Sequence, residues 1–150
     1  MINRMDRIIA FQPDIHVVVG IHNDYSGYTS AARIQAVSDY ITKFNQNLPD
    51  KDLVITGPKV LWGDTVAPML QLEADIQAGI LASGATNVTF IPTVSYALGD
   101  VANNSGLWFG GFVNGKYFFK NAGFTDPHPL TPESTMFNNY LAANLRAIFG

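Results

Sequence analysis

Two short polar segments, separated by about a hundred residues, carry side chains that could perform hydrolytic chemistry. The first, Gly20–Asp24, follows the apolar run Ile15–Val19 and contains Asn23. The second, Asp126–Pro129, contains His128 and precedes the last helix-forming stretch. An Asn amide can donate a hydrogen bond to a developing oxyanion, and a His oriented by a carboxylate can act as a general base. These segments would supply two of the three parts of a serine hydrolase site, and the nucleophile would be the third.

Each segment also has a structural interpretation, because Asn and Asp often form polar turns after strands and a Pro-flanked sequence can simply lead into a helix. On the functional interpretation, both segments supply catalytic residues and the first also supplies substrate-binding residues. The candidate catalytic residues are His128, Asp126 and Asn23. The candidate substrate-binding residues are Gly20, His22 and Asp24.

The sequence predicts neither a metal nor a cofactor. Cysteine is absent, and the three histidines lack the spacing of a metal site. His16 lies inside an apolar run, so we expect it to be a hydrogen-bonded core or edge residue. A flavodoxin-like binder of small molecules is disfavoured because no Gly-rich phosphate loop follows any expected strand.

Composition narrows the class of protein. A chain of 150 residues with 47% hydrophobic and 14% charged residues fits one globular domain, spanning residues 1–150. A net charge of −3 without any Lys/Arg run argues against a nucleic-acid partner. No stretch approaches the roughly 20 apolar residues of a membrane span, and the N-terminus lacks signal-peptide features. We therefore expect no membrane partner, and an extracellular or virion location is favoured over a cytoplasmic one.

Apolar, β-branched strands alternate with amphipathic helices along most of the chain. The expected strands are 15–19, 52–56 and 87–92. The expected helices are 3–12, a helix up to residue 47 with Ser30 as N-cap, and a helix that starts at Asp64 or Thr65 and is capped by Gly84. This alternation predicts a three-layer α/β fold, in which a parallel sheet is flanked by helices.

The segment between residues 95 and 130 departs from this alternation. Asn114-Gly115 is a strong type I′ turn signal between the aromatic runs Leu107–Phe109 and Lys116–Phe119. We expect an aromatic β-hairpin insertion near residues 107–120 that walls a pocket or packs on a partner. A last helix follows, with Thr131 as N-cap and Pro132 at its first position. The face expected to dock on the sheet consists of Phe137, Tyr140, Leu141, Leu145 and Ile148.

The two polar segments, with the elements around them, resemble the later blocks of the SGNH (GDSL) hydrolase family. In that family a Gly-x-Asn-Asp motif follows an apolar strand and an Asp-x-x-His-Pro motif precedes a C-terminal helix. The resemblance implies a flavodoxin-like fold and places the oxyanion-hole donor on Asn23, the general base on His128 and its supporting carboxylate on Asp126.

The chain departs from the family pattern in three ways. Two residues separate Gly20 from Asn23, where the family has one, and Pro127 alone separates Asp126 from His128. A shift of about 1 Å in such a side chain can cost around a hundredfold in rate. The family's Gly-Asp-Ser block is also absent, and Gly63-Asp64-Thr65 is better interpreted as the start of a helix.

The resemblance therefore implies the C-terminal part of an SGNH-type esterase or acetylesterase that acts on an acylated carbohydrate or another small ester. Its nucleophilic serine would come from an N-terminal segment or a partner chain, which would also complete the sheet. The alternative is a non-enzymatic carbohydrate-binding or assembly module of a virion tail or fibre protein, which suits a chain rich in Gly, Asn, Thr and aromatic residues. The sequence leaves open the identity of the ester and the oligomeric state, for which a homo-oligomer is one alternative.

Overall fold

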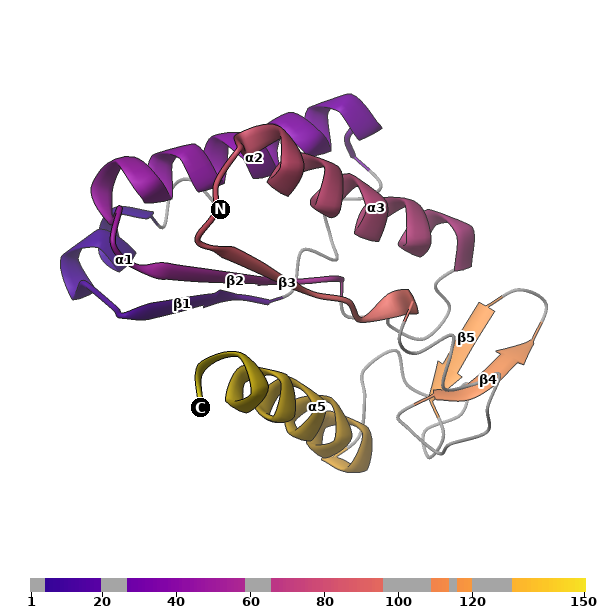
Figure 1. Cartoon of the computed structure of the whole chain (residues 1–150). Helices are drawn as coiled ribbons and strands as arrows, with labels where there is room; N and C mark the ends of the chain where they lie inside the picture. Colours follow the sequence, from indigo (N-terminus) through magenta and orange to yellow (C-terminus); the bar gives the residue numbers. More distant parts are fainter. Residues whose placement is uncertain (1–4, 20–26, 59–65, 96–108, 114–115, 120–130) are drawn as a thin grey trace.

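A computed structural model describes residues 5–19, 27–58, 66–95, 109–113, 116–119 and 131–150 (Figure 1). The helices are α1 (Met5–Phe11), α2 (Ser30–Asn47), α3 (Val66–Ser83) and α5 (Thr131–Phe149). The strands are β1 (Ile15–Val18), β2 (Asp52–Thr56), β3 (Val88–Ile91), β4 (Phe109–Val113) and β5 (Lys116–Phe119). The expected alternation of strands and helices is confirmed over this part of the chain. The expected helix start at Asp64 or Thr65 lies outside the described residues.

The first three strands form one parallel sheet in the order β1-β2-β3. Val17 of β1 is in register with Val54 of β2, and Ile55 of β2 is in register with Phe90 of β3. The predicted parallel α/β sheet is therefore confirmed. Because β2 has a neighbour on each side, it is the central strand of the described sheet.

Helices cover both faces of this sheet (Figure 1). Helices α2 and α3 lie on one face and α5 lies on the other. The hydroxyl of Tyr140 in α5 donates to the carbonyl oxygen of Pro92, just beyond β3, at 2.6 Å. The far end of α5 lies beside the start of β1, where Phe149 and Ile15 line one hollow. Helix α5 therefore runs antiparallel to the strands and begins at their carboxyl edge.

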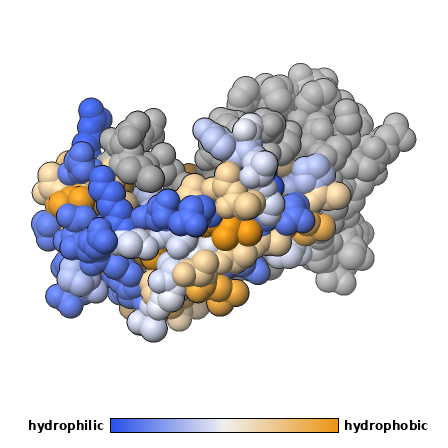
Figure 2. Space-filling view, turned by 90° about the horizontal axis from the view of Figure 1, so that it is seen from above, coloured by the Kyte–Doolittle hydropathy of each residue, from blue (hydrophilic) through white to orange (hydrophobic). Residues whose placement is uncertain are grey.

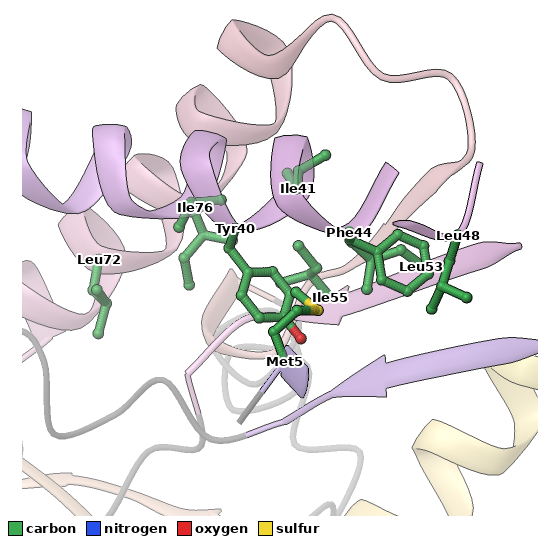
Figure 3. Close-up of a cluster of buried hydrophobic side chains, with 10 residues drawn as sticks. Met5, Tyr40, Ile41, Phe44, Leu48, Leu53, Ile55, Leu72 and Ile76 are labelled. Atoms are coloured by element: carbon green, nitrogen blue, oxygen red, sulfur yellow. The ribbon is translucent and has the colours of Figure 1, made fainter. Parts of the chain in front are cut away.

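The main core lies between the sheet and the α2–α3 layer (Figure 3). Helix α2 buries residues at helical spacing, and β2 supplies Leu53 and Ile55 from alternate positions on one face. Helix α1 contributes Met5, which is fully buried. The buried residues of this cluster are Met5, Val37, Tyr40, Ile41, Phe44, Leu48, Leu53, Ile55, Leu72 and Ile76.

The N-cap of α2 is Thr29, so the prediction of Ser30 is wrong. The Thr29 side chain accepts the backbone N–H of Ala32 at 3.3 Å. The Ser30 hydroxyl instead donates to the carboxylate of Asp75 in α3 at 2.6 Å, a partner 45 residues away. The predicted cap at Gly84 is confirmed, because its φ of 65° is the left-handed conformation that glycine tolerates.

The docking face predicted for α5 is partly correct. Phe137 is buried, and Leu145 lies beside the sheet. Ile148 is 38% exposed and does not dock as predicted, because the strand nearest this end of α5 is the edge strand β1. Between β3 and α5 in the sequence, β4 and β5 pair antiparallel, with an irregularity between Phe109 and Gly111. The predicted turn 114–115 lies outside the described residues.

The outer surface of the α2–α3 layer mixes hydrophilic and hydrophobic side chains, as Figure 2 shows. The most exposed large apolar side chain on α3 is Leu81, at 81%. Among the described helices, none is both long and apolar enough to cross a membrane.

Candidate functional site at the carboxyl edge of the sheet

The residues that the sequence predicts for the site lie outside the described residues. They are Gly20, His22, Asn23, Asp24, Asp126 and His128. The structure does describe the elements on either side of them. Strand β1 ends at Val18, shortly before the first polar segment, and α5 begins at Thr131, shortly after the second. Their proximity to one another stays a prediction.

A buried carboxylate, Glu73 of α3, organises the described part of the carboxyl edge. Its side chain is 3% exposed. It accepts the backbone N–H groups of Thr93 at 2.8 Å, Val94 at 2.6 Å and Ser95 at 3.0 Å. Val94 and Ser95 begin a helical turn, whose first N–H groups have no partner within the helix. Glu73 therefore caps this turn and holds the chain that leaves β3.

The chain that leaves β2 packs against the same carboxylate. The N–H of Gly57 donates to the carbonyl oxygen of Ile91 at 2.9 Å, and the hydroxyl of Thr93 donates to the carbonyl oxygen of Pro58 at 2.7 Å. A Cβ atom at Gly57 would overlap Oε2 of Glu73 and Oγ1 of Thr93. The absence of a side chain at Gly57 thus permits the two strand ends to converge on Glu73.

Ser95 is the exposed hydroxyl of this cluster, and its Oγ donates to Oε1 of Glu73 at 2.5 Å. The known serine hydrolases pair the nucleophile with a general base, most often a histidine. The histidine in the described part of the chain, His16, lies instead on β1, in register with Leu53 near the start of β2. The described residues therefore contain no Ser–His pair.

His16 occupies a structural position, as the sequence predicts. Its Nε2 lies 2.7 Å from the hydroxyl of Tyr40, and its ring stacks on Phe44 with centroids 5.9 Å apart. Burial lowers the pKa of His16 and raises the pKa of Tyr40 to about 12. The neutral imidazole and the phenol thus share one hydrogen bond between β1 and α2.

A second buried carboxylate, Asp75, links α2 to α3 and is 1% exposed. Arg33 forms an ion pair with it at 2.6 Å, and Ser30 and Gln71 donate hydrogen bonds to it. Burial alone would raise the pKa of Asp75, but the hydrogen bonds from Ser30, Gln71 and Arg33, with the charge of Arg33, outweigh burial and lower it. Ser30 and Arg33 join α2 to Asp75, while Gln71 lies one turn away on α3 itself, so we interpret this group as structural.

Neither buried carboxylate was predicted from the sequence. The available signal was that Glu73 and Asp75 interrupt the apolar face that α3 forms with Leu72 and Ile76. A carboxylate on such a face must find hydrogen-bond donors when it is buried.

Among the described residues, no three His, Cys, Asp or Glu side chains are grouped closely enough to hold a metal ion.

Comparisons of this chain with protein-family models, with curated proteins and with solved structures gave no match.

Proposed function

We propose that this chain is the C-terminal part of an SGNH-type esterase that hydrolyses an O-acyl ester of a carbohydrate or another small ester. Asn23 donates to the oxyanion, His128 is the general base and Asp126 orients the imidazole. Gly20, His22 and Asp24 line the substrate cleft. The nucleophilic serine comes from a polypeptide segment outside this chain, and the flavodoxin-like domain carries its aromatic hairpin as a wall of that cleft.

The observation that supports this proposal is the common edge at which β1 ends and α5 begins. Tyr140, at the middle of α5, reaches the carbonyl oxygen that follows β3, while Phe149 lies near the start of β1. The polar segment after β1 and the polar segment before α5 therefore connect to the same end of the sheet (Figure 1). Ligands of open parallel sheets bind at this carboxyl edge.

In the proposed reaction the serine Oγ attacks the ester carbonyl while His128 takes its proton. Asn23 stabilises the negative charge on the carbonyl oxygen, and the alcohol leaves with the proton from His128. Water then attacks the acyl-serine, again with His128 as the base, and releases the acid. The substrate class follows from the resemblance to the SGNH family. The proposed reaction requires neither a metal nor a cofactor.

The test is hydrolysis of p-nitrophenyl acetate by the chain, alone and mixed with a polypeptide that carries a Gly-Asp-Ser block. We expect activity in the mixture that His128→Ala abolishes and that Asn23→Ala lowers by about 10²–10³-fold, the usual effect of one oxyanion donor. His16→Gln is the matched control, because His16 contacts Tyr40 and Phe44 and should leave the rate unchanged.

Two other outcomes would change the proposal. Activity of the chain alone that Ser95→Ala removes would place the nucleophile in the Glu73 cluster instead. Binding of acetylated oligosaccharide without hydrolysis, even in the mixture, would favour the non-enzymatic module of a virion tail or fibre.

A further inference from the structure

The outer edge of β1 is unpaired within the described residues. Strand β1 pairs with β2 alone, so its other side is an open edge of the described sheet. The backbone N–H of Asp52 donates to the carbonyl oxygen of Asp14 at 3.1 Å. Because the direction of these groups alternates along a strand, the N–H and C=O groups of Ile15 and Val17 point away from β2. They form a row of donors and acceptors that another strand could pair with.

A hollow lies beside β1 on each face of the sheet. The hollow on the α2 face, about 380 Å³, is lined by Ile8, Phe11 and His16, and the Phe11 side chain is 85% exposed. The hollow on the α5 face, about 400 Å³, is lined by Ile15, Val17, Leu145 and Phe149. Apart from Arg7 and His16 in the first hollow and Arg146 in the second, the lining residues are apolar.

The positions of the two hollows match the positions that the side chains of an added strand would occupy. Successive side chains of a strand point to opposite faces of the sheet, so a strand paired with β1 would direct them alternately into the two hollows. Such a strand would have apolar residues on both faces.

A positive charge beside each hollow indicates which charges the partner strand carries. Arg7 lines the first hollow and Arg146 lines the second. Among the described residues, no carboxylate forms an ion pair with either arginine. A strand that carries acidic residues next to its apolar centre would complement both.

We propose that β1 binds an extended strand of another polypeptide, apolar on both faces and flanked by acidic residues. The unpaired edge and the two hollows do not depend on the proposed esterase activity, although the same strand would complete the sheet of the proposed enzyme. A second copy of the chain fits less well. Two antiparallel β1 strands would be related by a two-fold axis perpendicular to the sheet. Arg146 would then lie on the same face as Arg146 of the other copy, and Arg7 on the same face as the other Arg7, so the pairing would bring like charges and no acidic residue to each hollow.

The experiment measures fluorescence anisotropy of a dye-labelled β-strand peptide mixed with the whole chain. The acidic peptide has a Val-Ile-Val-Ile centre flanked by Glu residues, and the matched peptide has Lys in their place. We expect the acidic peptide to bind and the Lys peptide to bind about tenfold more weakly, since two ion pairs are replaced by two repulsions.

Val17→Pro is the decisive variant, because it removes an N–H that points outward while the ladder to β2 is kept. We expect it to lose most of the peptide affinity at an unchanged melting temperature. The double variant Arg7→Ala, Arg146→Ala should keep the fold and lose the preference for the acidic peptide, which gives a second test if Val17→Pro is unstable.

Three outcomes would overturn the proposal. In the first, neither peptide binds. In the second, Val17→Pro and the unaltered chain bind the acidic peptide equally well. In the third, the unaltered chain binds the acidic and the Lys peptide with the same affinity. Self-association of the chain in sedimentation velocity that Val17→Pro abolishes would also overturn it and would assign the edge to a second copy.

Discussion

Strands β1 and β2 are neighbours in one sheet but differ in environment. None of the four residues of β1 is buried, and Ile15 is 39% exposed. In β2 every residue from Leu53 to Thr56 is buried. Both sequences are rich in β-branched residues, so composition does not distinguish them. The difference shows that burial of a parallel strand depends on its neighbours on both sides, and β1 has one neighbour in the described structure.

The same substitution in the two strands should have very different effects, and this is the largest difference that we predict. Ile55 is 1% exposed, so Ile55→Ala should lower the free energy of unfolding by about 2–5 kcal/mol. Ile15→Ala should cost less than about 1 kcal/mol, because its side chain is already in part exposed. Urea denaturation monitored by circular dichroism measures both. Equal losses would mean that β1 is covered in solution.

The glycines that follow the two strands should also differ. Gly57, directly after β2, packs against Glu73 and Thr93, so Gly57→Ala should destabilise the protein by about 1–3 kcal/mol. Gly27, in the connection after β1, has open space around its Cα, and Gly27→Ala is the matched control with little or no loss. The same denaturation curves provide the measurement. A Gly57→Ala protein as stable as the control would contradict the close packing at Glu73.

The smallest effect that we predict concerns His16, the residue of β1 that packs against α2. Burial lowers the pKa of His16 in the folded state below its usual 6.5, so the unfolded state binds the proton at higher pH. Stability should therefore be greatest above about pH 6.5 and decline as the pH falls below it. Thermal melts of the protein and of His16→Phe should diverge in this range.

Asp75 does not interfere with this measurement. Its pKa is lowered from 3.8, so the stability that it contributes is lost only in more acidic solution. A His16→Phe protein with the same pH dependence as the unaltered chain would show that the imidazole is as hydrated in the fold as in the unfolded chain.

Local sequence patterns predicted the elements well where local forces decide them. Strand β2 and the end of α2 lie at the predicted residues, and Gly84 adopts the predicted conformation. The prediction failed at Ser30, whose hydroxyl bonds Asp75 in another helix, and it missed Glu73, whose donors follow β3. Both depend on contacts between residues far apart in the chain. For the candidate site, the sequence predicts the residues and the structure describes the elements that flank them.

The order of strands and helices and the parallel sheet could be predicted from the residues alone, because periodicity, caps and turn residues act over a few neighbouring positions. Long-range packing places β2 in the centre and β1 at an edge, and it brings two strand ends to Glu73. It also decided that apolar hollows flank β1 on both faces. Burial and hydrogen bonding are set by whatever packs alongside, and those partners come from distant parts of the chain.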